Sequence, residues 1–257
     1  MTGEMYQIAS IVAAAKMAMQ TDKRIKFTPT KYENSIRFIF LPKKEFLRTK
    51  NYTAQNVSEW FEQLKKNGVQ DIKLLCPYAV KDRHFLGFSN TTESLILCFF
   101  KKGKVTYFRA DWQFDSVQKQ WNILYSEHEW ENPPSEKPHF ENNIDSFRKV
   151  LLDIQKLAVQ IECENFAHVF ESAIRLLDGG NEYLDKKYGL ELPQIPNQNL
   201  QIFEAASEAD VFGAMGSWND SPPYMAHEKG LDKEYETLSA ELLKNVRLAI
   251  LYAVNEW

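Results

Sequence analysis

The chain has 257 residues, of which 44% are hydrophobic and 13% aromatic, so it can bury a sizeable core and wholesale disorder is excluded. Only 10 glycines and 10 prolines exclude collagen-like and low-complexity classes. The net charge of −4 combines a basic stretch, residues 1–110 with 19 Lys and Arg against 9 Asp and Glu, and an acidic remainder with 12 against 26.

The first part of the chain is expected to mix helices and strands. Apolar residues recur at helical spacing between residues 5 and 19, which predicts an N-terminal helix. The apolar run 36–41 ends at Pro42 and predicts a strand, and Asn67-Gly68 is typical of a helix C-terminus. In order, we expect a helix over 4–20, strands at 25–27 and 36–41, a helix from 53 to 67 and a strand at 72–76.

The clearest strand pattern follows. Two apolar runs, 95–100 and 105–112, flank the turn Lys102-Gly103, which predicts a β-hairpin. A third strand is expected at 121–125 after a polar turn. Because the connections are short, these three strands should form an antiparallel meander.

Residues 131–140 break this pattern, since three prolines in ten residues cannot continue a helix or a central strand. Beyond them apolar residues recur every three or four positions, as in helices. A break near 163–165 separates the first two helices, or one long helix runs through it. The helices are expected at about 144–161, 166–177, 181–188, 200–210 and 231–255.

The sequence therefore predicts an α+β fold with the domain boundary in the proline-rich segment. Residues 1–135 should form an α+β domain with an antiparallel sheet, a β-meander and helices. Residues 136–257 should form an all-helical C-terminal domain.

A glycine-rich segment before the last helix, residues 213–220, is the candidate site, and we call it the candidate loop. Its glycines permit backbone angles and close approaches that other residues resist. Its short polar side chains can hydrogen-bond neighbouring backbone, and its tryptophan offers a large flat face with one donor. The candidate binding residues are Gly213, Gly216, Ser217, Trp218, Asn219 and Asp220.

Together with the last helix, the candidate loop resembles a family of uncharacterised bacterial proteins. The family has a Gly-[Gly/Ala]-Met-Gly-Ser-[Phe/Trp]-Asn-Asp turn and a long helix that ends in Ala-x-Asn. Here the turn reads Gly213-Ala-Met-Gly-Ser-Trp-Asn-Asp220, and the helix ends in Ala253-Val-Asn255. The resemblance covers none of the expected sheet. It implies a bacterial, cytoplasmic protein of accessory or immunity type and carries no activity.

Two interpretations of the candidate loop stay open. In the first, which we favour, the loop caps and locks the last helices, and Trp218 fills the gap between them. In the second, it is a surface for a ligand or a partner, since ordered glycine-rich loops serve both purposes.

No complete catalytic motif stands in the chain. Ser217, Asp220 and His227 are the right types for an acyl-transfer triad, but no G-x-S-x-G elbow is present. The densest group of possible metal ligands, within residues 127–139, lacks the H-E-x-x-H pattern and is typical of a solvated acidic linker. His168 is expected to be packed within a helix. We therefore expect no cofactor and no metal, and we lean away from an enzyme.

Three functions fit these features. The favoured one is a non-catalytic protein-interaction or accessory protein, immunity-like, because abundant aromatics accompany the missing motifs. The alternative is an enzyme or small-ligand binder with a pocket at the inter-domain cleft near the candidate loop. The third is nucleic-acid binding through the basic N-terminal half. Its tightest basic cluster is Lys43, Lys44, Arg48 and Lys50, which with Phe46 and Tyr52 could grip a single strand by charge and stacking.

The partner is expected to be a protein, with nucleic acid less favoured. The oppositely charged halves should attract each other, within one molecule or by self-association, and this would compete with a polyanion for the basic face. No membrane interaction is expected, since no stretch reaches about 18 apolar residues. Three well-separated cysteines and the absence of a signal-peptide pattern predict a cytoplasmic protein.

Overall fold

The computed structural model describes residues 1–257 except 46–47, 51, 181–190 and 192. The strands of the described chain lie between residues 33 and 129, and the regular elements described from residue 144 on are all α-helices. This distribution confirms the α+β class, with a sheet and helices first and helices after it. The short helix expected at 181–188 lies outside the described residues.

The sheet half contains two α-helices. The first, α1 (Gly3–Thr21), matches the expected N-terminal helix. The second, α2 (Val57–Lys66), begins later than expected, because Asn56 is its N-cap and Thr53 belongs to a strand. The remaining elements are β1 (Glu33–Ile39), β2 (Lys43–Glu45), β3 (Arg48–Lys50), β4 (Thr53–Ala54), β5 (Val69–Leu75), β6 (Leu95–Phe100), β7 (Val105–Asp115), β8 (Gln120–Glu129) and two 3-10 turns, η1 (Arg83–Gly87) and η2 (Lys101–Gly103).

Six of these strands form one mixed sheet in the order β4-β1-β8-β7-β6-β5. The expected meander of β6, β7 and β8 is antiparallel. At one edge of the sheet, β5 pairs antiparallel with β6. After the meander, β8 pairs parallel with β1, so that Phe38 lies opposite Tyr125. This parallel pair is the one departure from antiparallel order among the described strands. Residues 25–27 form no strand, although Ile25 is buried.

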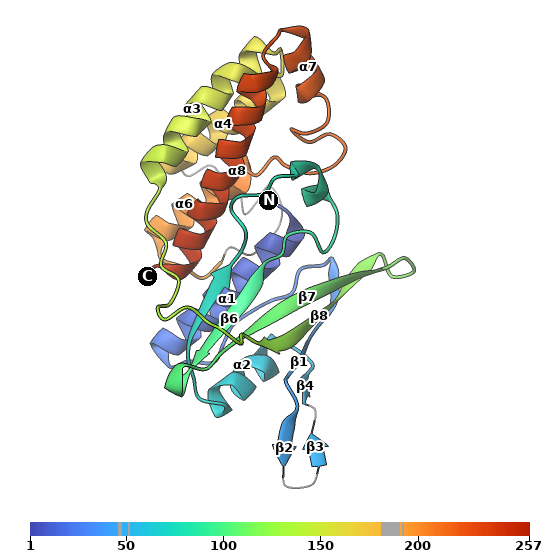
Figure 1. Ribbon diagram of the computed structural model, residues 1–257, viewed down its shortest axis with the longest axis vertical. Coiled ribbons are helices and arrows are strands. Elements are labelled where there is room, and N and C mark those ends of the chain that lie inside the picture. Colours follow the sequence, from blue (N-terminus) through green and yellow to red (C-terminus); the bar gives the residue numbers. More distant parts are fainter. Residues whose placement is uncertain (46–47, 51, 181–190, 192) are drawn as a thin grey trace.

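The helices α1 and α2 pack against one face of the sheet (Figure 1). The ring of Phe38 lies in this core, stacked on Trp60 at 4.9 Å and on Tyr125 at 4.8 Å between centroids. All three are fully buried. The opposite face carries the exposed His128 ring, which stacks on Tyr107 at 5.2 Å.

The strands β2 and β3 pair with each other and form an arm that projects from the sheet (Figure 1). The base of the arm is closed where the N–H of Phe40 donates to the carbonyl of Tyr52 at 3.0 Å. Their rings also touch, with centroids 5.6 Å apart. The arm therefore leaves the sheet at a fixed point.

The helical half packs around one long central helix. That helix, α8, contacts α3, α6 and α7, and also α1 and β5 of the sheet half. The break expected between the first two helices is present, and α7 was not expected from the sequence. The bounds are α3 (Ile144–Gln160), α4 (Glu164–Leu177), α6 (Asn197–Ala209), α7 (Pro222–Glu228) and α8 (Asp232–Asn255).

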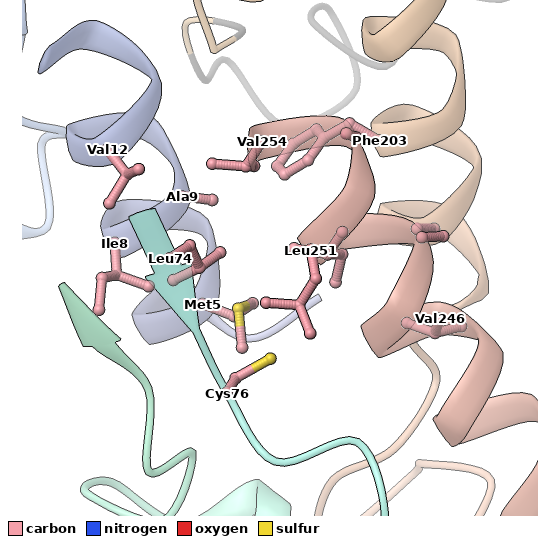
Figure 2. Packing of buried hydrophobic residues seen from close by; sticks show 14 of the residues in the cluster. Met5, Ile8, Ala9, Val12, Leu74, Cys76, Phe203, Val246, Leu251 and Val254 are labelled. Carbon is pink, nitrogen blue, oxygen red and sulfur yellow. The ribbon is translucent and has the colours of Figure 1, made fainter. Parts of the chain in front are cut away.

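The two halves meet where α1, β5 and α8 come together. Met5 and Ile8 from α1, Leu74 from β5, and Leu251 and Val254 from α8 lie in one buried cluster (Figure 2). A single hydrophobic core therefore runs through both halves. Whether residues 1–135 and 136–257 fold as independent domains stays a prediction.

Candidate functional site

The candidate loop lies between α6 and α7 and is bonded to itself. Gly216 has a φ of +76°, a left-handed conformation that favours glycine, and its N–H donates to the carboxylate of Asp220 at 2.7 Å. The hydroxyl of Ser217 donates to the carbonyl of Gly213 at 2.9 Å and accepts from the N–H of Asn219 at 3.2 Å. The polar groups predicted to bind a ligand thus bind one another.

Trp218 is fully buried. Its ring meets the edges of Phe166 and Phe170 at 5.1 and 5.3 Å and stacks on Tyr235 at 5.5 Å. Its indole N–H donates to the hydroxyl of Ser239 at 2.8 Å, and its carbonyl accepts from the hydroxyl of Tyr235 at 2.6 Å. Burial raises the pKa of Tyr235 to about 12, which keeps this hydroxyl a donor. These contacts support the bracing interpretation.

The loop also holds the helical half against η1 of the sheet half. The amide of Asn219 donates to the carbonyl of Arg83 at 2.9 Å, and the guanidinium of Arg83 pairs with Glu236 at 2.6 Å. A Cβ on Gly87 would lie 2.7 Å from the carbonyl carbon of Gly213, so only glycine permits this approach. Sequence reasoning missed Gly87, because nothing around a lone loop glycine signals what passes beside it.

One side chain of the loop remains free for a partner. Met215 is 95% exposed, at a point where the loop lies against η1. Phe85 and Phe88 beside Gly87 are each more than half exposed, and their rings lie 6.4 Å apart. We call Phe85, Phe88 and Met215 the apolar patch.

The residue types considered for acyl transfer are not brought together. The hydroxyl of Ser217 is donated to a backbone carbonyl within the loop. The ring of His227 bonds instead to Asp232 at 2.9 Å, and this pair is exposed to solvent. The carboxylate of Asp220 holds the backbone of the loop. No Ser–His contact therefore exists among these described residues.

The residues weighed as metal ligands separate in the same way. Glu127 accepts hydrogen bonds from the N–H of Leu41 and the hydroxyl of Thr106, both at 2.8 Å, whereas His128 points to the opposite face of the sheet. Within the part of the chain that the structure describes, no three His, Cys, Asp or Glu side chains are placed to hold a metal ion. The expectation that His168 is packed is wrong, since its side chain is 77% exposed beside Glu171.

The oppositely charged halves do meet within the chain, and the described residues form three ion pairs between them. Arg83 pairs with Glu236, and Lys73 pairs with Glu256 at 2.9 Å. The third, between Lys137 and Asp71 at 2.7 Å, has its charges the other way round. Glu256 also accepts from the ring of His139 at 2.8 Å. Its partial burial would raise the pKa of Glu256, but the hydrogen bonds from Lys73 and His139 outweigh burial and hold that pKa below its usual value.

The end of the α8 helix completes this junction. The side-chain amide of Asn255 accepts from the N–H of Leu74 at 2.8 Å and donates to the carbonyl of Leu74 at 2.9 Å. It thereby supplies the hydrogen bonds that another strand would supply to the edge strand β5. The carbonyl of Asn255 in turn accepts from the buried ammonium of Lys16 at 2.8 Å.

At the other end of the sheet, three segments surround one hollow. We call residues 40–42, 52, 61–68 and 100–104 the basic end; together they hold five Lys against one Glu. They are the base of the arm, the last turns of α2 and the β6–β7 turn (Figure 1). The hollow between them has a volume of about 520 Å³. Its lining residues include Phe40, Tyr52, Gln63, Lys101, Lys104 and Glu127.

The lysines of the β6–β7 turn are unpaired among the side chains that the structure describes. Lys101, Lys102 and Lys104 are exposed and form no hydrogen bond or ion pair with any side chain that the structure describes. In α2, Lys65 lies over the ring of Phe61 and near Glu62, whereas Lys66 is unpaired within the same described set. The sequence predicted the neighbouring cluster of Lys43, Lys44, Arg48 and Lys50, whose side chains lie outside those that the structure describes. The β6–β7 turn and α2 join the base of the arm only through the fold.

Comparison of the chain with protein-family models, curated proteins and solved structures finds no match. The resemblance of residues 213–220 and 253–255 to a bacterial family therefore stays a prediction. Among the described helices, none is both long and apolar enough to cross a membrane. The three cysteines are free, and burial raises the pKa of the Cys76 and Cys98 thiols.

Proposed function

We propose that this protein is a non-catalytic binding protein whose basic end binds a nucleic acid through its phosphates. The observation that carries the proposal is a hollow where the base of the arm, α2 and the β6–β7 turn meet, lined by Lys101 and Lys104, which are unpaired among the described residues. The proposal promotes the third of the functions that the sequence left open.

The charge arrangement favours an external anion over the acidic half of the same chain. The three ion pairs that the described residues form between the halves involve Lys73, Arg83 and Lys137, none of which belongs to the basic end. In Figure 1 the helices α3, α4 and α8 lie at the opposite end of the molecule from the arm and α2. Lysines without internal partners can neutralise phosphates and so release the counterions condensed on a nucleic acid, which favours binding.

The test is binding of a fluorescent oligonucleotide, of about 20 nucleotides, across a series of salt concentrations. Lys101, Lys102 and Lys104 are replaced together by Gln. The matched control replaces Lys156, Lys233 and Lys244 of the helical half, which changes the net charge equally. The β6–β7 variant should lose affinity about tenfold or more, and its slope of log affinity against log salt should fall by about 2.

The control variant should bind like the parent protein. Equal losses in both triple variants would contradict the proposal, because they would reflect net charge alone. Absence of binding at low salt would contradict it as well.

A protein partner is the second candidate, and the apolar patch favours it. Phe85 and Phe88 expose neighbouring rings, and Met215 exposes its side chain on the loop that lies against Gly87, as residues at protein interfaces do. This surface fits the accessory or immunity-like role that the sequence favoured. Phe88→Ser combined with Met215→Ser should abolish capture of a protein partner, and the triple lysine variant should retain it. The same partner captured by both variants would contradict this candidate.

The alternative that the sequence left open, an enzyme or small-ligand pocket beside residues 213–220, gains no support from the contacts of that loop. Its polar groups bond to one another, and none of its residues lines the 520 Å³ hollow.

A further inference from the structure

We infer that the nucleic acid is single-stranded and that the hollow of the basic end receives one unpaired base, while the phosphates on either side lie on Lys101 and Lys104. The inference rests on the proposed function and names the partner of that same site. It is carried by the size of the hollow, the aromatic side chain at its wall and the distribution of charge across it.

The hollow has the size of a ligand pocket. Its volume of about 520 Å³ lies within the range of about 300–1,000 Å³ that holds small molecules. A nucleotide whose base is turned out of the strand fits such a space. A duplex keeps its bases stacked inside and presents only its phosphates, so it cannot fill the hollow without being opened.

An aromatic ring is held at the wall of the hollow. Tyr52 is 37% exposed, although its backbone carbonyl accepts from the N–H of Phe40 and its ring lies 5.6 Å from the ring of Phe40 between centroids. Phe40 is itself buried against Phe108, whose ring centroid lies 5.3 Å away. Tyr52 is therefore an exposed ring on a rigid support, which is what a base needs for stacking without loss of side-chain freedom.

Charge divides the hollow into two parts. The carboxylate of Glu127 lies in its wall, half-buried, with one oxygen accepting from Leu41 and the other from Thr106. Its negative charge disfavours a phosphate beside it and tolerates a neutral base. The exposed Lys101 and Lys104 favour phosphates at the opening. The base therefore enters and the backbone stays outside.

The last turn of α2 supplies polar groups for the edge of the base. The side-chain amide of Gln63 donates to Asn67 at 3.1 Å, and this bond orients its carbonyl oxygen as an acceptor. Amino groups of adenine, cytosine and guanine are donors that match it. Gly68 follows with a φ of +80° and no atom within 4 Å of a would-be Cβ, so the rim beside Gln63 is open.

The experiment compares four fluorescent probes at one ionic strength. They are a single-stranded oligonucleotide, the duplex of the same sequence, an abasic strand with the same phosphates, and polyglutamate. The parent protein should bind the single strand at least about tenfold more tightly than the other three, because only the single strand offers phosphates and free bases together.

Variants of Tyr52 separate stacking from charge. Tyr52→Ala should weaken binding of the single strand by about 5- to 100-fold and leave binding of the abasic strand unchanged. Tyr52→Phe should restore the parent affinity. Tyr224→Ala, an exposed tyrosine of the helical half, is the matched control and should change nothing. Thermal melts check that each variant is folded. A further variant, Gln63→Ala, keeps Tyr52 and should weaken binding of the base-bearing single strand but not of the abasic strand.

The outcomes distinguish the two proposals. If no probe binds with salt dependence, the proposed function fails. If the duplex or the abasic strand binds as tightly as the single strand, or if folded Tyr52→Ala binds like the parent, the single-strand inference is overturned while the phosphate contacts remain. If polyglutamate binds best, the site belongs to an acidic protein and the inference is overturned too.

Discussion

At the junction between the sheet and the helices, and in the core of the helical half, lysines and aromatic rings are enclosed by partners, whereas Lys101, Lys104 and Tyr52 of the basic end face solvent. Lys16 and Lys73 are buried and bonded, and Trp218 is surrounded by three rings. Lys101 and Lys104 are exposed and unpaired within the described chain, and Tyr52 shows its ring to the hollow.

This difference separates residues that stabilise the fold from residues that can bind. A buried donor already satisfied by the protein has nothing to offer a ligand, and its removal costs stability. An exposed charge without a partner contributes little to stability and is available to an anion. Arg247 complicates the contrast, because it is buried while two of its nitrogens have no hydrogen-bond partner among the described atoms.

The largest effect on stability is expected at Trp218, which tests whether enclosed side chains stabilise the fold. Trp218→Ala should lower the free energy of unfolding by about 3–5 kcal/mol, because a fully buried side chain is removed and Ser239 loses its partner. Chemical denaturation measures this loss. Tyr52→Ala, the aromatic truncation at the basic end, should cost less than about 1 kcal/mol. A Trp218 variant as stable as the parent would remove the bracing interpretation.

Asn255 tests whether α8 protects the edge of the sheet. Asn255→Ala should cost about 2–4 kcal/mol, because the N–H and the carbonyl of Leu74 both lose their partner in a buried site. Hydrogen exchange reports the effect directly, since the amide of Leu74 should exchange faster while that of Ile96 in β6 changes less. Unchanged protection of Leu74 would show that Asn255 is dispensable.

Gly87 tests whether the close approach between η1 and the candidate loop stabilises the protein. Gly87→Ala should destabilise by about 1–3 kcal/mol, because its Cβ would overlap the backbone of Gly213. Thermal or denaturant unfolding measures this change. Gly3→Ala is the matched control, since nothing lies within 4 Å of its would-be Cβ. If the two variants unfold alike, the close approach does not constrain the loop.

The sequence predicted the elements whose patterns are local. The strand at 95–100 and the long C-terminal helix follow from runs and periods that neighbouring residues define. The parallel pairing of β1 with β8 could not be predicted, because it depends on where a distant meander returns to the sheet. The short α7 was missed because seven residues give too little periodicity.

For the candidate sites too, the sequence predicted local features and missed those that depend on the fold. The candidate loop was found because its glycines and polar residues are adjacent, and the buried environment of Trp218 was one of two stated interpretations. The basic cluster in the arm was also visible. The hollow was not, since it needs Gln63, Lys101 and Glu127 from three segments that only the fold brings together.

The smallest expected effect concerns acid and the ion pair at the junction. The pKa of Glu256 lies below its usual value of 4.5, so its stabilising effect is fully present above that value and is lost as the pH falls through the lower value of the folded state. The difference in unfolding free energy between the parent and Glu256→Gln should therefore shrink from about pH 6 to about pH 3.

Asp153→Asn is the control for this prediction. The hydrogen bond from Lys149 lowers the pKa of Asp153, but Lys149 is exposed and water screens the pair. The Asp153 variant should therefore lose less than about 0.5 kcal/mol of unfolding free energy. A Glu256 difference that does not vary with pH would mean that Lys73 and His139 do not stabilise the charged form, and the contrast between the bonded lysine of the junction and the exposed Lys101 and Lys104 would weaken.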